Sequence, residues 1–422
     1  MLFTLFYGVF TESGTSFIYM LLLYFLTFVV CYFFISSFLK NRLKFKVKKF
    51  NNHKYKNSNF KDILIFSLCS LLFITVISHY IDIGFVPVIK AYFSSDYYEV
   101  VDIRKQGSYL STRPVRYLSS FMIKSIIPFL LFYLLISRRY ILFSVIFTLG
   151  IFYAFSLMQK SFIITILFPC FTYAILKRHY LMSITFTLTL FSYMFCLLNI
   201  TNPQLKPKDR VIAKTEIIKE NSENDKKDPQ IKKELSLKEI ENKFKEQETN
   251  KSITGKNKKT TNNLPTFVNS LIKRVLITPG KIVSKWFENI PSNQPFLGGC
   301  GYRFIAPIIG CKYQNYSQEL YKNIFPKYAA KGIKGNVNTT SFMYEYSNFG
   351  VAGLIFSALV MGLIIAFIDY LFAFSLLCKF SINGFYVLML SSSALTTLMF
   401  SGGWALMIIL FYIYKSEFLK LH

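Results

Sequence analysis

The chain has 422 residues, of which 53% are hydrophobic, and its 49 Lys and Arg against 22 Asp and Glu give a formal net charge of +27. Such a charge is typical of nucleic-acid-binding proteins, but here it is spread over loops between long apolar runs and not concentrated in one basic domain. This distribution excludes a nucleic-acid partner and indicates an integral membrane protein, because about 20 apolar residues cross a bilayer as a helix.

Nine apolar runs follow one another along the chain. They span residues 17–39, 63–80, 117–136, 141–158, 162–176, 181–198, 351–374, 385–400 and 404–414. The opening ten residues, before Thr11 and Glu12, are too short for a span and lack the basic start of a signal peptide, so we expect an interfacial segment there. The pattern predicts an all-α polytopic membrane protein with about nine transmembrane helices, or ten or more if the opening segment also crosses.

The basic residues of the short loops predict the orientation of the chain. Segment 40–61 holds nine Lys and Arg and no acidic residue. Counting spans onward places the loops of Arg138, Lys177 and Lys379 on the same side as this segment. We therefore expect these loops and the C-terminus to be cytoplasmic, and the N-terminus to lie outside.

The same alternation predicts two extracytoplasmic loops and three regions. An N-terminal transmembrane bundle, 1–200, contains the first loop, 81–116; a large and partly helical loop, 201–341, follows; C-terminal helices occupy 342–422. Part of the large loop, 206–263, is rich in Lys, Glu and Asn. Such a segment buries too little apolar surface to fold alone, which predicts a mobile insert. Aromatic residues, Pro and Gly return in 264–341, which we expect to pack on the membrane surface.

Cysteines and nucleotide motifs give no sign of a cofactor. Of seven Cys, Cys300 and Cys311 share one outer loop, where they could form a disulfide or remain thiols. The chain has no GxxxxGK[ST], GxGxxG, HExxH or GxSxG motif. We expect no metal and no cofactor, and the absent motifs argue against an ATP-driven pump or a serine hydrolase.

Basic residues border the first outer loop and the spans beside it. Arg104, Arg113 and Arg116 could bind a lipid diphosphate, since a planar guanidinium matches phosphate with two hydrogen bonds. Equally, they could be interfacial arginines whose stems lie along apolar surface. Lys124 lies inside the third run, where a charge is usually functional or paired. Lys160 lies at the outer turn between the fourth and fifth runs, an ordinary position for a lysine.

The stretch 271–310 is the most informative part of the large loop. It begins with Arg274, continues through an amphipathic segment that contains Trp286, and ends with Tyr302 and Arg303. Aromatic residues favour the membrane interface. The stretch predicts a helix that lies on the outer leaflet and carries basic residues toward the head groups.

Segment 335–350 precedes the seventh run and brings Glu345 to the membrane boundary. Its other polar candidates are Asn338, Tyr344, Tyr346 and Asn348. A carboxylate at this boundary could act as a general base, or it could only cap the helix, where the dipole favours an acid. Gly350 and Gly353 are expected to allow close approach of helices.

Several motifs resemble those of Wzy-type oligosaccharide repeat-unit polymerases. They are RVLITP at 274–279, WFENIP at 286–291, FLGG at 296–299, NTTSFMYEYSNFGVAGL at 338–354 and MQKS at 158–161. The insert 206–263 departs from the pattern of that family. The resemblance implies a membrane glycosyltransferase of the bacterial inner (plasma) membrane, active in O-antigen or capsule synthesis.

What the resemblance implies about the reaction is specific. A growing glycan is transferred from undecaprenyl diphosphate onto an incoming lipid-linked oligosaccharide repeat unit, without a nucleotide. The implied partners are that lipid-linked oligosaccharide, the bilayer, and a chain-length regulator and flippase of the same pathway. Catalytic roles are expected for Glu345, Arg274 and Arg303. Substrate-binding roles are expected for Arg104, Arg113, Arg116, Lys160, Tyr302, Asn338, Tyr346 and Asn348.

Two other functions remain open. An O-antigen ligase would share this architecture and attach the finished glycan to another acceptor. A transporter or flippase of lipid-linked oligosaccharides would line its membrane interior with polar residues. Charged residues within the runs are few, Lys124 and Asp369, which argues against transport.

Overall fold

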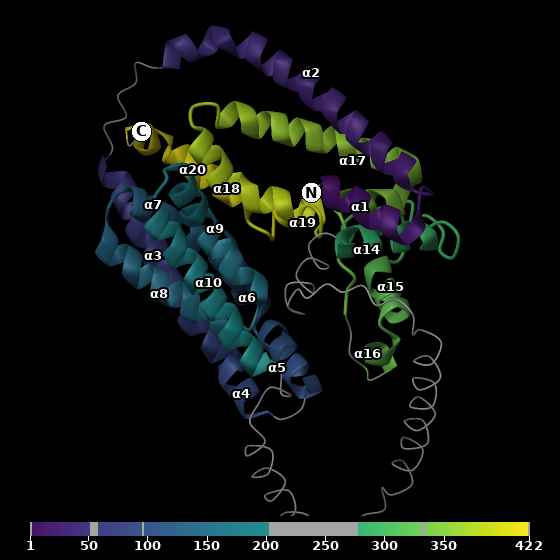
Figure 1. Ribbon diagram of the computed structural model, residues 1–422, viewed down its shortest axis with the longest axis horizontal. Coiled ribbons are helices and arrows are strands. Elements are labelled where there is room, and N and C mark those ends of the chain that lie inside the picture. The colour runs from purple at the N-terminus through teal and green to yellow at the C-terminus, as the bar shows by residue number, and fades with distance from the viewer. Residues whose placement is uncertain are drawn as a thin grey trace, which may run out of the picture. The chain divides into compact units, whose positions relative to one another are not determined.

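The computed structural model describes residues 2–50, 58–94, 97–201, 277–330, 332 and 335–420 (Figure 1). Within these ranges every regular element is a helix. Residues Met1–Pro203 and Ile272–His422 together form one compact unit. The insert predicted at 206–263 and the candidate residue Arg274 lie outside the described residues.

The helices are as follows in chain order. They are α1 (Leu2–Ser13), α2 (Ile18–Phe50), α3 (Ser58–Ile83), α4 (Pro87–Phe93), α5 (Tyr97–Tyr109), α6 (Arg113–Phe121), the π-helical turn η1 (Met122–Ile126), α7 (Ile127–Ile136), α8 (Tyr140–Ser156), α9 (Lys160–Leu176), α10 (Tyr180–Thr201), α14 (Thr278–Asn289), α15 (Tyr316–Ile324), α16 (Pro326–Ala330), α17 (Ser341–Leu371), α18 (Leu376–Met389), α19 (Leu395–Met399), α20 (Trp404–Ile413) and α21 (Lys415–Lys420).

Apolar helices occupy the predicted membrane runs. Five segments are long and apolar enough to cross a bilayer: Ile18–Asn41, Phe60–Ile83, Arg113–Ile136, Tyr180–Thr201 and Ser341–Leu371. Shorter apolar helices, of 10–17 residues, are α8, α9, α18 and α20. The prediction of an all-helical protein with several membrane-spanning helices is therefore confirmed for the part of the chain that the structure describes.

The eighth predicted run does not form one helix, so the limits predicted for it, 385–400, are wrong. Helix α18 already begins at Leu376, and a turn separates its end from the short α19. Ser375 caps α18 by accepting a hydrogen bond from the Cys378 amide at 3.3 Å. The helix ends before Ser391, Ser392 and Ser393, because serine hydroxyls compete with helical hydrogen bonding by bonding nearby backbone groups.

Three tight turns of the same kind join α7, α8, α9 and α10. Each contains a non-glycine residue with positive φ: Arg138 at 57°, Met158 at 54° and Arg178 at 58°. At the third turn the His179 amide donates back to the Ala174 carbonyl at 2.8 Å, which satisfies a carbonyl at the helix end. Turns this short make consecutive helices antiparallel neighbours, and these pairs are in contact.

The larger hydrophobic core surrounds the segment Arg113–Ile136, in which 78% of the most apolar stretch is buried. Three buried polar side chains form a hydrogen-bonded series within this core. The Ser119 and Tyr153 hydroxyls are 2.6 Å apart, and the Tyr153 hydroxyl lies 2.7 Å from His79 Nδ1. Because buried polar groups need hydrogen-bond partners, these hydrogen bonds hold α3, α6 and α8 together.

A second core joins the start of the chain to the large loop. Helix α1 packs on α14, and α2 runs along α17 (Figure 1). The crossing of α1 and α14 is close: a Cβ added to Gly280 would lie 2.5 Å from the Cα of Gly8. Ion pairs flank it, from Glu12 to Lys281 at 3.1 Å and to Lys285 at 3.4 Å. The opening segment is thus a docked helix, and it is not among the segments long enough to span.

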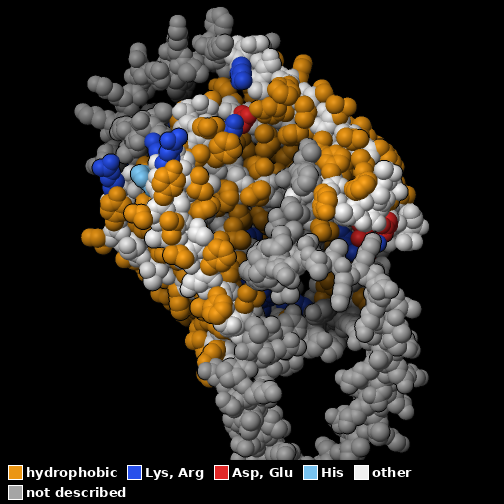
Figure 2. Space-filling model, in the orientation of Figure 1, with side chains coloured by type: hydrophobic (Ala, Val, Ile, Leu, Met, Phe, Trp, Pro, Cys, Tyr) orange, Lys and Arg blue, Asp and Glu red, His pale blue; other side chains and the backbone are white. Residues whose placement is uncertain are grey.

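Apolar side chains cover much of the visible face, and basic side chains gather toward one end of the helices, at the upper left of Figure 2. The most apolar stretches of α2 and α10 are only 11% and 17% buried. Exposed apolar surface of this extent suits hydrocarbon better than water. The arrangement fits helices that face lipid.

Candidate functional site

Helix α17, which carries the seventh run, is bent at Gly350. That residue has φ 61° and ψ −139°, a conformation that glycine adopts without a steric penalty. Beyond the bend, a Cβ added to Gly353 would lie 2.1 Å from the carbonyl oxygen of Glu345. Gly350 and Gly353 were expected to bring two helices together, and the structure instead uses them to bend one helix. The bend separates a short first segment from the apolar remainder.

Glu345 lies on that first segment and is half-buried. Its Oε2 atom is buried and has no hydrogen-bond partner among the described residues. Tyr302 is its electrostatic neighbour, because the charge of the Glu345 carboxylate acts on the Tyr302 phenol. Burial and the charge of Glu345 raise the pKa of Tyr302, which keeps the phenol protonated as a donor. One carboxylate oxygen is therefore left for another hydrogen-bond donor.

The loop that carries Tyr302 is tied to α17 by Asn348. The Asn348 side chain accepts from the Gly301 amide at 3.1 Å and donates to the Tyr344 carbonyl at 2.7 Å. A Cβ on Gly301 would lie 2.7 Å from the Asn348 amide group, so the contact requires glycine there. Cys300 and Cys311 are joined in a disulfide that closes the loop. Asn348 thus positions Tyr302 against Glu345.

Tyr346 is likewise occupied within the protein. Its hydroxyl donates to the Ile290 carbonyl at 3.3 Å, and its ring contacts those of Phe287 and Phe296. A helix forms in the stretch where one was predicted, α14, with Trp286 and Phe287 buried; its position on the outer leaflet stays a prediction. Tyr346 therefore packs this helix onto α17.

The hydroxyl residues just before Glu345 were not among the predicted site residues. Thr339 and Thr340 are 1% and 0% exposed, and their side-chain oxygens have no hydrogen-bond partner among the described residues. Thr340 occupies the N-cap position of α17, yet its side chain makes no capping bond. Both lie inside the motif NTTSFMYEYSNFG, which was the signal that could have identified them.

The remaining candidates of the large loop are exposed. Arg303 is exposed, and its guanidinium carbon lies 5.2 Å from the centre of the Tyr313 ring. Asn338 is also exposed, two residues before the N-cap. Arg303 is therefore free to meet an anion from solvent, while a cation–π contact holds it beside the loop.

The first outer loop contributes helices α5 and α6. Arg104 and Arg113 are exposed, and Arg116 is half-buried with Nη2 2.8 Å from the Ser111 carbonyl. Lys160 is the first residue of α9 and is half-buried. These four basic residues lie on α5, α6 and α9, whereas Glu345 lies on α17.

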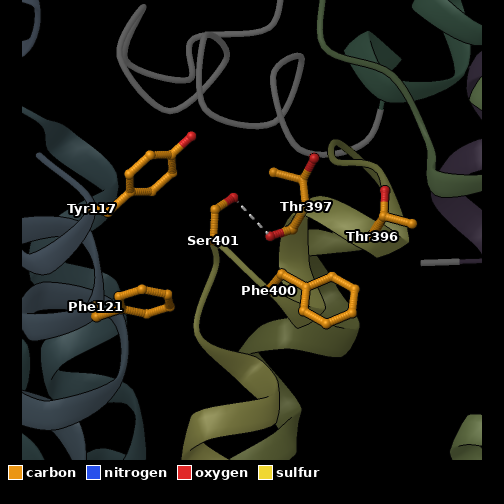
Figure 3. A pocket seen from close by; sticks show the side chains of 6 residues that line it. All are labelled: Tyr117, Phe121, Thr396, Thr397, Phe400 and Ser401. Atoms are coloured by element: carbon orange, nitrogen blue, oxygen red, sulfur yellow. Dashed lines mark hydrogen bonds between the residues drawn. The ribbon is translucent and has the colours of Figure 1, made fainter. Parts of the chain in front are cut away.

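A cavity of about 370 Å³ lies between α6 and the segment around α19. Tyr117 and Phe121 project into it from α6, and the opposite wall consists of Thr396, Thr397, Phe400 and Ser401 (Figure 3). This cavity could not be predicted from the sequence, because hydroxyl residues at the edge of an apolar run form no pattern that distinguishes a cavity from an ordinary turn.

Lys124 lies three residues beyond Phe121, within η1. The π-helical turn is accommodated by Tyr386, whose hydroxyl donates to the Lys124 carbonyl at 2.5 Å, and by the Ser125 hydroxyl, which donates to the Gly403 carbonyl at 2.7 Å. Such turns are frequent at functional sites. Lys124 is half-buried and is not among the residues that line the cavity.

No known family model matches the chain, and no curated protein and no solved structure matches it.

Proposed function

We propose that this protein is a membrane glycosyltransferase that polymerises lipid-linked oligosaccharides, transferring a growing glycan from undecaprenyl diphosphate onto an incoming repeat unit in O-antigen or capsule synthesis. Glu345 carries the proposal. It offers, at the N-terminal end of an apolar helix, a buried carboxylate oxygen that has no hydrogen-bond partner in the part of the chain that the structure describes. Leaving such an atom unpaired costs roughly 1–3 kcal/mol, which a substrate hydroxyl would recover by bonding to it.

Glu345 would act as the general base. It accepts the proton of the acceptor sugar hydroxyl while that oxygen attacks the anomeric carbon of the donor glycan. The bond from this carbon to the diphosphate oxygen breaks, and undecaprenyl diphosphate leaves with the bonding electrons. Tyr302, held by the loop tied to Asn348, would orient the carboxylate by donating a hydrogen bond to it.

Arginine would stabilise the charge that develops on the leaving diphosphate. The exposed guanidinium of Arg303 adjoins Tyr302 in sequence and is open to an anion. Arg274, in the motif RVLITP, has the same proposed role. Removing one preorganised donor of this kind costs on the order of a hundredfold in rate.

The proposal requires the large loop to face the outside of the inner membrane. The disulfide Cys300–Cys311 supports this, because such bonds persist in oxidising compartments. The exposed basic turns at Arg138 and Arg178 support a cytoplasmic location for the opposite helix ends. Impermeant thiol labelling of whole cells should modify an Asn293→Cys variant and spare Asn52→Cys, and the reverse result would overturn this orientation.

The decisive experiment replaces Glu345 in purified protein supplied with a lipid-linked repeat unit. Glu345→Gln keeps the size and a hydrogen bond but removes the base, so ladder formation should fail nearly as completely as in Glu345→Ala. Glu288→Gln is the matched control, since Glu288 pairs with Lys285 on α14 at 2.8 Å. All three variants are compared with the parent protein at equal amounts in the membrane.

A fully active Glu345→Gln variant would exclude Glu345 as the general base. For the leaving group, Arg303→Ala should abolish ladders, and Arg303→Lys should restore only part of the activity, because a lysine lacks the bidentate fork. A strain that lacks the gene should keep single repeat units and lose the ladder. Unchanged ladders in that strain would refute the polymerase itself.

A further inference from the structure

The cavity beside α6 has the composition of a site for a small polar ligand. Its volume of about 370 Å³ falls within the range of small-molecule sites. Four of its six lining residues bear a hydroxyl: Tyr117, Thr396, Thr397 and Ser401. The side chains of Tyr117, Thr396 and Thr397 are exposed, so their hydroxyls are open to a ligand.

The lining also specifies the charge of the ligand. None of its six lining residues is acidic or basic. A phosphate group would lack a counter-charge there, whereas a neutral polyol would find both donors and acceptors. Tyr117 and Phe121 add aromatic rings that point into the gap from α6 (Figure 3). Ring faces carry partial negative charge and suit the polarised C–H groups of a sugar.

The two walls are held together by specific bonds. The Ser120 hydroxyl donates to the Ser401 carbonyl at 3.1 Å, and the Ser125 hydroxyl donates to the Gly403 carbonyl at 2.7 Å. Gly403 has φ 80°, and a Cβ there would lie 1.8 Å from the Ser125 oxygen. The turn after α19 therefore takes one defined place against α6, and the cavity is preorganised.

We propose that this cavity is a binding subsite for one sugar ring, with the ring against Tyr117 and its hydroxyls bonded by the threonines. The Ser401 hydroxyl donates to the Thr397 carbonyl at 3.2 Å and would accept a hydrogen bond from the sugar. As the source of that sugar we take the lipid-linked glycan, and in this respect the inference rests on the proposed function. Position along α6 supports the source. The cavity begins one turn after Arg113, at the end of a membrane-spanning segment, where a lipid-linked sugar would enter.

The test measures sugar binding directly on the full-length protein. Saturation-transfer NMR is recorded in phosphatidylcholine nanodiscs, which contain no sugar, with methyl glycosides of glucose, galactose and N-acetylglucosamine as probes. At least one glycoside should bind. Tyr117→Ala should weaken it about two- to tenfold, as expected for one aromatic contact, and Thr397→Val should also weaken it. Tyr412→Ala is the matched control, because Tyr412 is 58% exposed against 54% for Tyr117 and does not line the cavity.

Binding that is lost in the cavity variants and retained in the control would support the subsite. Absence of binding for every glycoside, or equal binding by Tyr117→Ala and the parent protein, would overturn it. Failure of the proposed function looks different. If cavity-dependent sugar binding is found while gene deletion leaves polymer ladders unchanged, the subsite stands and the polymerase is refuted. If sugar binding fails while Glu345→Gln abolishes ladders, the polymerase stands without this subsite.

Discussion

Replacing Gly280 with alanine should push α1 away from α14. The added Cβ would lie 2.5 Å from the Cα of Gly8 and 2.6 Å from the Leu5 carbonyl oxygen, both backbone atoms that cannot rotate away. Carbon atoms in contact normally lie about 3.5–4.0 Å apart. The helices must therefore separate by roughly 1 Å, and overpacking of this kind costs about 1–3 kcal/mol.

That cost is comparable with what holds the helix in place. Leu5 and Val9 are fully buried in the second core, and each contributes about 1.5–3 kcal/mol by burial. A penalty of about 1–3 kcal/mol should thus lower the equilibrium constant for docking of α1 on α14 roughly 5- to 150-fold. Gly150→Ala is the control, since its Cβ would meet only the side chain of Ile127.

Disulfide trapping measures this docking. The side-chain oxygens of Ser13 and Ser284 are hydrogen-bonded in the structure, so Ser13→Cys with Ser284→Cys should form a disulfide. A protease site inserted within 206–263 then separates the chain into two pieces unless the disulfide joins them. Gly280→Ala should slow cross-linking and Gly150→Ala should not. Equal rates in the parent and in Gly280→Ala would refute the close crossing.

Three further perturbations test the packing. Tyr153→Phe removes the hydroxyl shared by Ser119 and His79 and should lower the free energy of unfolding by about 1–3 kcal/mol, seen as thermal unfolding at a lower temperature, whereas Tyr412→Phe should not. Lys379→Met breaks the 2.5 Å ion pair with Asp369 and should lower the free energy of unfolding by between ~1 and ~3 kcal/mol, which lies between the values for exposed and buried ion pairs. A double variant in which the two charges are exchanged should recover part of this loss. Burial raises the pKa of Glu12, but the two lysines of α14 outweigh this and lower the pKa below its usual value. The ion pairs of Glu12 should therefore add stability near neutral pH that is lost as the pH falls through that lowered pKa, so the thermal unfolding temperature of the parent protein should fall toward that of Glu12→Gln over this range.

The helical plan could be predicted from the sequence because it depends on local properties. Apolar runs separated by basic turns predict helices and their ends, and the turns at Arg138 and Arg178 lie where the loops were expected. The eighth run shows the limit of this reasoning. A hydropathy average over the run hides the serines at 391–393, whereas in the structure α18 ends at Met389, just before them.

The candidate site could be predicted only in part, because its contacts join distant segments. Glu345 was selected from the sequence, and the structure adds Tyr302 as its neighbour and leaves one carboxylate oxygen without a hydrogen-bond partner within the described ranges. Asn348 and Tyr346 were expected to bind substrate, but their polar groups bond the protein backbone. Periodicity could not reveal this, since a polar side chain at a loop end has the same pattern whether it meets a ligand or another loop.

Glu345 and the proposed sugar subsite lie on segments joined by a backbone hydrogen bond, from the Ser341 amide to the Leu390 carbonyl at 2.9 Å. Ser341→Pro removes that amide donor together with the serine hydroxyl. Proline is well tolerated as the first residue of a helix, and Thr340, at φ −61° and ψ 154°, already has the extended conformation that a following proline requires. We expect α17 to persist, with the free energy of unfolding lowered by about 1 kcal/mol, and polymer ladders to fall more steeply because the base and the sugar lose their common support. A Ser341→Ala control keeps the amide. Full ladders from Ser341→Pro would show that the two segments act independently.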